Sequence, residues 1–155
     1  MELVLWRHAD AEDAAIGRPD DERRLTPKGA RQAERMAEWL RERLPRDAVV
    51  VASPARRAQQ TARHLTEKYQ VVDAVGTGAN VRELLDAVGW PRRGGTVVVV
   101  GHQPTLGQAV ALALSGRPGE WGVKKGAIVW LAWRERGDGP SAQLRAALSP
   151  DLLKE

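Results

Sequence analysis

The chain of 155 residues is long enough for one domain, and its 24 basic and 20 acidic residues give a net charge of +4. It contains no cysteine, which excludes disulfides and thiolate metal sites, so the fold depends on its core alone. The charges stand in mixed-sign segments such as Asp20 to Arg24 without interleaved aromatic residues, which argues against a nucleic-acid-binding face.

The first apolar run, Leu3 to Trp6, predicts a buried strand that ends at Arg7 and His8. Open α/β sheets bind ligands at the carboxyl ends of their strands, so these two side chains are candidates for a functional site. The run is too short for a signal peptide and, with Glu2 before it, wrongly flanked. Since no run is long enough to span a membrane, we expect a cytoplasmic protein without membrane contact.

The next segment predicts a loop, a helix and a second strand. Asp10 to Arg24 is polar and is expected to pass over the carboxyl end of the first strand. A helix then begins with Thr26 as its cap and Pro27 at the first helical position, and it ends before Pro45. Ala48 to Ala52 is apolar on both faces, which is typical of a parallel strand.

A second strand-to-helix crossover follows. Ser53 can cap a helix that opens with Pro54 and extends to about Lys68. Arg56 and Arg57 lie in its first turn, where a cation opposes the helix dipole. Two cations in this unfavourable position indicate an anion nearby.

The remaining chain predicts four strands and two helices. The Val-rich run is expected to be the central strand, and the last two strands an antiparallel pair joined by a turn at Gly137 to Pro140. In chain order the expected elements are a strand at Val71 to Val75, a short helix at Val81 to Val88, the central strand at Thr96 to Val100, a helix at Pro104 to Ser115, and strands at Ala127 to Trp133 and Ala142 to Ala147. We therefore expect a single α/β domain over residues 1–155, a three-layer sandwich with a mostly parallel central sheet, helices on both faces and an antiparallel edge.

Three of the predicted strands end in polar groups that a parallel sheet would bring to one edge. These groups are Arg7 and His8 after the first strand, Ser53 with Arg56 and Arg57 after the second, and His102 after the central strand. Two imidazoles and at least two guanidinium groups suit a tetrahedral dianion, because arginine offers planar forks of donors. Helix amino termini at the same edge add backbone N–H groups.

A metal site is the alternative for the same histidines. His8 and His102 with Asp10 or Glu83 would make a two-histidine, one-carboxylate set. The neighbouring guanidinium groups would repel a cation, so we expect neither a metal nor another cofactor. His64, further along the second helix, is expected at the surface or the edge of the core.

Four motifs in this order resemble the histidine phosphatase superfamily, the phosphoglycerate-mutase-like group, and most of all its small SixA-type phosphohistidine phosphatase branch. Ala9 departs from the family signature, where glycine follows the histidine, and this excludes a conformation that only glycine adopts. The motifs are Arg7-His8-Ala9, Leu25-Thr26-Pro27-Lys28-Gly29, Ser53 to Thr61, and Gly101-His102-Gln103-Pro104.

The resemblance implies a two-step phosphoryl transfer. His8 would attack phosphorus and become phosphohistidine, and water would then release phosphate. Arg7, Arg57 and His102 would hold the three non-bridging oxygens. Arg57 occupies the motif's arginine position, so Arg56, one residue earlier, is expected to face solvent or substrate.

Three further residues take their expected roles from the resemblance. Ser53 and Gln103 would bind phosphate, although Ser53 is equally suited to cap the helix. Glu83 matches the family's acid only loosely. Phosphohistidine leaves as imidazole, which needs less protonation than an alkoxide, so a weak or missing acid matters less for that substrate.

The leading hypothesis is a phosphohistidine phosphatase that acts on a phosphohistidine-bearing carrier or phosphorelay protein. A small-molecule phosphomonoesterase with the same pocket is the first alternative, a mutase would need a more enclosed site, and a phosphate-binding module without turnover would not need a nucleophile. A chain of this length lacks large insertions, so we expect an open site, with Trp121 in a loop near its mouth. We also expect a monomer.

Overall fold

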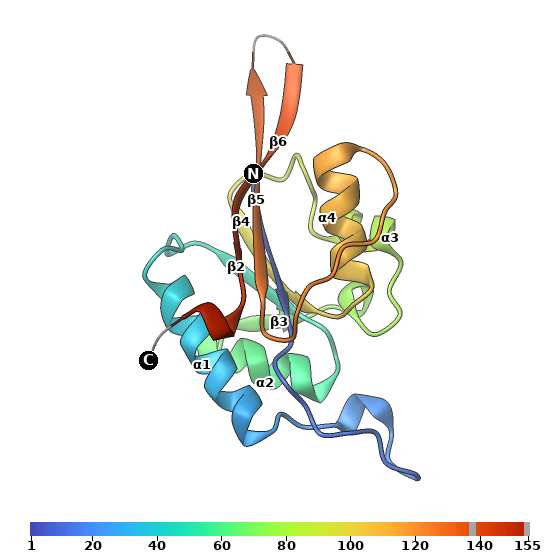
Figure 1. Ribbon diagram of the computed structural model, residues 1–155. Coiled ribbons are helices and arrows are strands. Elements are labelled where there is room, and N and C mark those ends of the chain that lie inside the picture. The colour runs from blue at the N-terminus through green and yellow to red at the C-terminus, as the bar shows by residue number, and fades with distance from the viewer. Residues whose placement is uncertain (137–138, 154–155) are drawn as a thin grey trace.

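The computed structural model describes residues 1–136 and 139–153, and this part of the chain forms a six-stranded sheet between two layers of helices (Figure 1). The order across the sheet is β3-β2-β4-β1-β5-β6. The strands are β1 (Glu2–Arg7), β2 (Val49–Ala52), β3 (Tyr69–Val71), β4 (Thr96–Gly101), β5 (Ile128–Arg136) and β6 (Gly139–Leu148). The first four are parallel, β5 pairs antiparallel with β1, and β6 pairs antiparallel with β5. The predicted sandwich with an antiparallel edge is confirmed; residues 137 and 138 of the expected turn lie outside the described residues.

Alternate side chains of each strand enter opposite helical layers, as the period of two in a strand requires. Val4 and Trp6 pack with α1 and α2 on one face, and Leu3 and Leu5 pack with α3 and α4 on the other. The strands at the centre are therefore apolar on both faces, which is why their sequences do not alternate. The helices are α1 (Pro27–Arg41), α2 (Arg56–Leu65), α3 (Val81–Ala87) and α4 (Thr105–Ser115).

The start of α1 is fastened to the loop that follows β1. The Thr26 hydroxyl accepts from the Gly29 amide at 3.0 Å and donates to the Asp10 carboxylate at 2.7 Å. A Cβ at Gly29 would lie 2.0 Å from the Asp10 carbonyl oxygen, so the close approach of the two backbones requires glycine. The Leu-Thr-x-x-Gly motif thus holds the chain directly behind His8.

The predicted strand Val71 to Val75 is wrong in its position. The strand β3 ends at Val71, and Asp73–Val75 form a 3-10 turn, η2. Val75 is buried, but it reaches the core from this turn, whereas Val71 is 49% exposed at the sheet's edge. An apolar run alone does not distinguish these two ways of burying a valine. The helix α2 also ends earlier than expected, at Leu65 rather than near Lys68.

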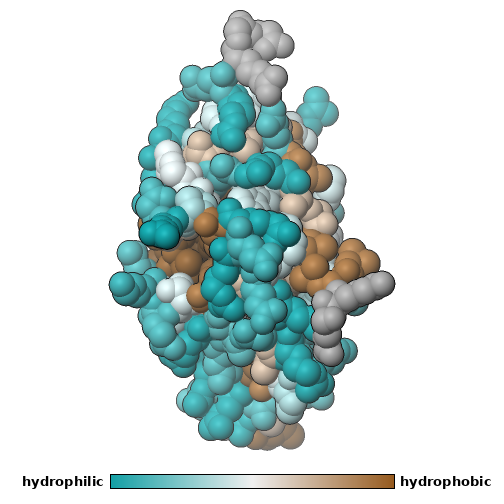
Figure 2. Space-filling model, turned by 90° about the vertical axis from the view of Figure 1, so that its left-hand side faces the viewer, coloured by the Kyte–Doolittle hydropathy of each residue, from teal (hydrophilic) through white to brown (hydrophobic). Residues whose placement is uncertain are grey.

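The loop from Asp10 to Arg24 is present as expected and contains one 3-10 turn, η1 (Asp20–Glu22). In Figure 1 it is the blue segment that projects at the bottom of the molecule. The face on which α1 lies is largely hydrophilic (Figure 2). The exposed residues of this helix include Lys28, Arg31, Glu34, Glu38 and Arg41. Among the described residues no helix has the length and apolar character needed to cross a membrane.

Candidate active site

The carboxyl ends of β2, β4 and β1 lie next to one another and bring the expected side chains together. Arg7 is paired with Gly101 across the sheet, the His8 amide donates to the Gly101 carbonyl at 3.0 Å, and the Ser53 amide donates to the Val100 carbonyl at 3.0 Å. The ring centroids of His8 and His102 are consequently 5.2 Å apart. His8, Arg57 and His102 are 6%, 3% and 4% exposed.

The ring of His8 is held in one tautomer by the backbone. Its Nδ1 lies 2.8 Å from the carbonyl oxygen of Ala9. A carbonyl can only accept, so Nδ1 carries the proton and Nε2 keeps a free lone pair. The pKa of His8 is lowered to about 3, mainly by burial; His102, Arg57 and Arg7 contribute to this lowering, and the Ala9 hydrogen bond opposes it. The imidazole is therefore neutral at pH 7 and available as a nucleophile.

Thr61 holds Ala9, whose carbonyl oxygen orients the ring of His8. Its hydroxyl accepts from the Ala9 amide at 3.1 Å and donates to the Arg57 carbonyl at 2.8 Å, and the side chain is fully buried. The last residue of the Ser53 to Thr61 motif thus ties β1 to α2. Ala9 adopts an ordinary backbone, since no described residue other than glycine has a positive φ, and the departure from the family's glycine causes no strain here.

His102 is held by side chains rather than by the backbone. Its Nε2 lies 2.7 Å from the Ser53 hydroxyl, which also accepts from the Ala55 amide at 3.0 Å, and its Nδ1 lies 3.5 Å from Nη2 of Arg57. A guanidinium can only donate, so Nδ1 accepts and Nε2 carries the proton. Burial lowers the pKa of His102 to about 4; Arg57 adds to this effect and Asp20 opposes it. Ser53 therefore both supports the start of α2 and orients His102.

Both arginines leave one buried donor without a partner. Arg7 donates from Nη1 to the Val123 carbonyl at 2.8 Å, while burial and the charge of Arg57 lower its pKa. Arg57 directs Nη1 to the Asp20 carbonyl at 2.8 Å and Nη2 to the Asp20 carboxylate at 3.0 Å. The Nε atoms of both side chains are buried and have no hydrogen-bond partner among the described residues. An unsatisfied buried donor is costly, so these two N–H groups are candidates for binding the oxygens of an anion.

Arg56 lies outside this site. It is exposed in the first turn of α2, whereas its neighbour Arg57 is buried. The structure thus places the two arginines as the motif register predicts.

Within the described part of the chain, the side chains of Gln103 and Glu83 form no hydrogen bond or ion pair with the other site residues. Gln103 donates to the Trp121 carbonyl at 2.7 Å and accepts from the Gly107 amide at 2.7 Å, so its amide holds the loop before β5 against α4. Glu83 is exposed in the first turn of α3, and its carboxylate takes part in no hydrogen bond or ion pair with the described residues. Their phosphate-binding and acid roles stay predictions.

Three residues near the site escaped the sequence reasoning. The sequence predicts Asp20 only as part of a polar loop, although its carboxylate binds Arg57. Thr61 is the last residue of the Ser53 to Thr61 motif, which indicates that it is important, but its role is visible only from its contact with Ala9 in the folded chain. Thr77 lies 3.5 Å from Nη2 of Arg57 and 3.5 Å from Nε2 of His102, and no pattern in its segment indicates this.

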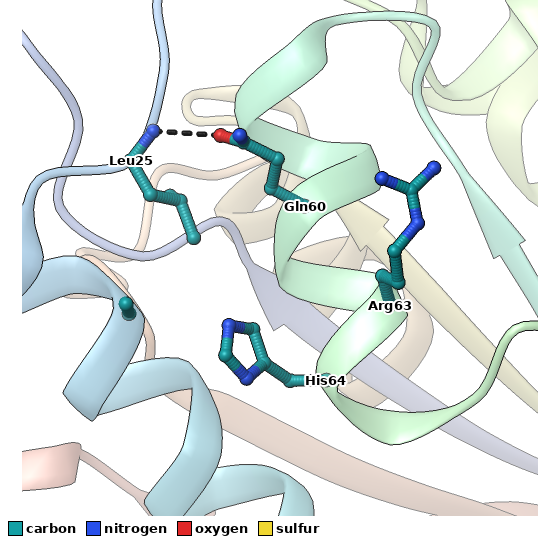
Figure 3. Close-up of a pocket in the computed structure, with 5 residues that line it drawn as sticks. Leu25, Gln60, Arg63 and His64 are labelled. Atoms are coloured by element: carbon teal, nitrogen blue, oxygen red, sulfur yellow. Dashed lines mark hydrogen bonds between the residues drawn. The ribbon is translucent and has the colours of Figure 1, made fainter.

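A separate cavity of about 350 Å³ lies between the start of α1 and α2 (Figure 3). Gln60 crosses one side of it and accepts from the Leu25 amide at 2.8 Å. His64 lines it as well, 29% exposed and paired with Glu34 at 2.9 Å, which confirms its expected place at the edge of the core. Within the described residues, no group of three or more histidine, cysteine, aspartate or glutamate side chains is arranged to hold a metal ion.

Comparisons with known proteins identify the family of the chain. A family model described as the histidine phosphatase superfamily (branch 1) matches residues 3–84. An uncharacterised protein of Mycobacterium leprae (strain TN) is 34% identical over 105 residues, 63% of this chain and 61% of that protein, so the chain spans about three fifths of its length. A phosphohistidine phosphatase SixA homolog of Haemophilus influenzae is 24% identical over 148 residues, 86% of this chain and 88% of that protein.

A solved structure extends the likeness over the whole fold. The structure of the protein histidine phosphatase SixA complexed with tungstate has a TM-score of 0.82 and 25% identity, covering 99% of this chain and 100% of that one. The chain belongs to the histidine phosphatase superfamily. Within it, the fold is like that of the SixA phosphohistidine phosphatases.

Proposed function

We propose that this protein is a phosphohistidine phosphatase that removes the phosphoryl group from a phosphohistidine-bearing protein by way of a covalent intermediate on His8. One observation carries the proposal: a neutral imidazole lies beside two arginines, and among the described residues neither its Nε2 nor the buried Nε–H groups of the arginines have a hydrogen-bond partner. A phosphoryl group would supply both the electrophile for Nε2 and the missing acceptors for the arginines. The likeness to a protein that binds tungstate, a tetrahedral oxyanion, supports this assignment.

In the first step Nε2 of His8 attacks phosphorus, and the bond from phosphorus to the substrate's imidazole nitrogen breaks. That nitrogen keeps the electron pair of the broken bond and takes a proton from water or a nearby acid. In the second step water attacks the phosphorus on Nε2 and gives up a proton to solvent. The bond from phosphorus to Nε2 breaks with its electron pair returning to Nε2, and inorganic phosphate is released. Arg7 and Arg57 offset the charge on the non-bridging oxygens, and the neutral His102 turns its Nε2–H from Ser53 to donate to one of them. Such fixed charges and donors are the main contribution of a protein to phosphoryl transfer.

The lack of a positioned acid beside His8, within the described residues, favours phosphohistidine as the substrate class. Asp20 contacts Arg57, and no carboxylate among the described residues is poised beside His8 to protonate a departing alkoxide. An imidazole is a better leaving group than an alkoxide, so this arrangement suits phosphohistidine more than a phosphoester. The small-molecule phosphomonoesterase, the first alternative, would depend on Glu83 moving into the site.

The test compares substrates and one variant. The purified protein is assayed on a phosphohistidine protein and on a panel of small phosphoesters, with and without Glu83→Gln. We expect preference for phosphohistidine and less than about a threefold effect of the substitution on it, because the leaving group needs little assistance. Preference for phosphoesters, with a large loss in Glu83→Gln, would support the phosphomonoesterase instead.

We also propose that turnover needs no metal, because the guanidinium groups at the site would repel a cation. Activity after dialysis against a chelator should equal that of the untreated protein, and vanadate, which adopts the geometry of the transferring phosphoryl group, should inhibit both samples equally. Loss of activity that added metal restores would contradict this. The single domain, the monomeric state and the cytoplasmic location stay predictions.

A further inference from the structure

The loop between β1 and α1 places a carboxylate on the arginine that the proposed reaction needs. Both terminal nitrogens of Arg57 are engaged by Asp20: Nη1 by its carbonyl oxygen at 2.8 Å and Nη2 by its carboxylate at 3.0 Å. Arg57 is 3% exposed, whereas the side chain of Asp20 is 49% exposed. A half-exposed anion thus covers a buried cation from the solvent side, along which a phosphoryl group would have to approach.

A second contact fastens the same turn over the site. Asp21 accepts from the Thr77 hydroxyl at 3.1 Å, and that hydroxyl lies 3.5 Å from both Arg57 Nη2 and His102 Nε2. Arg23 also donates to the Asp20 carboxylate, at 3.0 Å. Partial burial raises the pKa of Asp20, but Arg57 and Arg23 outweigh it and hold that pKa below its usual value. Asp20 is therefore ionised at neutral pH.

A phosphoryl group and a carboxylate compete for the same donors. A guanidinium binds either anion through its planar fork of N–H groups, and Asp20 occupies two of the three nitrogens of Arg57. The sequence predicts an open pocket, and with Asp20 in this position Arg57 and His102 are 3% and 4% exposed. The loop must therefore release Arg57 before a phosphoryl group can bind there with both terminal nitrogens.

We propose that Asp20 is an intramolecular competitor of the phosphoryl group, displaced from Arg57 by substrate and returning to expel product phosphate. This inference rests on the proposed function, since it assigns Arg57 to phosphate. The competitor lowers the apparent affinity for every anion at the site, because only the molecules in which Arg57 is free of Asp20 are competent to bind it there. Inorganic phosphate makes no contacts beyond the site, so its affinity is lowered by the full effect of the competitor. A protein substrate makes further contacts elsewhere, which offset part of this loss of affinity.

The alternative is that Asp20 positions Arg57 for phosphate and stays bound to it. The two roles predict effects of opposite sign on phosphate affinity. Removing a competitor tightens binding, while removing a positioning residue weakens it. General loss of structure also weakens binding, so tightening cannot come from damage to the fold.

The experiment measures the dissociation constant of inorganic phosphate by calorimetry for the wild type and Asp20→Asn. We expect binding about 5- to 30-fold tighter in Asp20→Asn, the size of effect typical of a hydrogen bond to a charged group. Glu22→Gln is the matched control, because it removes one negative charge from the same exposed turn and its carboxylate forms no hydrogen bond or ion pair with a described residue. Its effect should stay within about twofold, as expected for a screened surface charge.

A double-mutant cycle locates the effect. In an Arg57→Ala background, Asp20→Asn should no longer change phosphate affinity, because the group for which the two anions compete is gone. Unchanged or weaker phosphate binding in Asp20→Asn overturns the competitor while leaving the proposed function intact. Absence of phosphate binding in the wild type and in Asp20→Asn alike would overturn both.

A measurement on the wild type guards against a variant that fails to fold. The Arg23 amide donates to the Asp20 carbonyl at 3.2 Å and the Glu22 amide to the Pro19 carbonyl at 3.0 Å. If phosphate displaces Asp20, hydrogen exchange at these two amides should become faster when inorganic phosphate is added. Slower exchange there would mean that the turn closes further on phosphate, and unchanged exchange that it does not move; either result contradicts the proposal.

Discussion

The carboxyl ends of β1 and β4 carry the same side chain in the same buried setting, yet they hold it differently. His8 is tied at Nδ1 to a backbone carbonyl and has a free Nε2, whereas His102 is engaged at both nitrogens by Arg57 and Ser53. Burial lowers the pKa of both rings, to about 3 and about 4. The difference in partners, and not in pKa, therefore distinguishes the proposed roles of the two rings, His8 as the nucleophile and His102 as a residue that orients and donates.

Substitution of the two histidines should show the greatest loss of kcat and should distinguish their roles. His8→Asn removes the nucleophile and should lower kcat for phosphohistidine hydrolysis by at least about 10⁴-fold, while His102→Asn, which keeps a donor, should cost about 10²- to 10³-fold. Steady-state assays at saturating substrate measure both. His64→Asn, at the edge of the cavity between α1 and α2, is the control and should leave kcat unchanged. Equal losses in the two site variants would mean that the two rings share one role.

Arg57 and Arg56 provide the next comparison, since they are adjacent in sequence and differ in burial. Arg57→Ala should lower kcat/KM by about 10²- to 10³-fold, because it removes a fixed donor from the phosphoryl oxygens. Arg56→Ala should cost less than about threefold, as expected for a screened surface charge. The reversed ranking would mean that the anion binds on the exposed side of α2.

Much of the site is predictable from residues that stand at the ends of elements. Apolar runs locate β1, β2 and β4, and the polar residues directly after them locate His8, Ser53 and His102, because parallel strands end at one edge. Contacts made across long stretches of sequence are not predictable in this way. Asp20 reaches Arg57 over 37 residues, and Thr61 reaches Ala9 over 52 residues. Neither contact leaves a local pattern, so both require the folded chain.

Substitutions of Thr61 test whether the backbone at Ala9 orients His8. Thr61→Val keeps the shape of the side chain but leaves the buried Ala9 amide without an acceptor, which should cost about 1–3 kcal/mol of unfolding free energy. Because Ala9 holds the ring of His8, kcat should fall by about tenfold as the nucleophile loses its alignment. Thr61→Ser, which retains the hydroxyl, should recover most of kcat. Loss of stability with unchanged kcat would assign Thr61 to the fold alone.

The smallest expected effect concerns stability and pH. The pKa of His8 is about 3 in the folded chain and 6.5 in a model compound, so the unfolded state binds one proton more between these values. The free energy of unfolding should therefore fall as pH decreases below about 6.5, and His8 should contribute a slope of about 1 kcal/mol per pH unit near pH 5.5. Denaturant titrations of the wild type and His8→Ala at pH 6 and pH 5 measure this share. A slope that His8→Ala leaves unchanged would mean that His8 is protonated in the folded protein.

The central claim, that Nε2 of His8 takes the phosphoryl group, has a direct measurement. A labelled phosphoryl donor is mixed with the wild type, the reaction is quenched in alkali, and the labelled residue and ring nitrogen are identified by mass spectrometry and phosphorus NMR. We predict an acid-labile, alkali-stable label on Nε2 of His8 that is absent from His8→Ala. A label on Nδ1 of His8 or on His102, or no label on the wild type, would contradict the account.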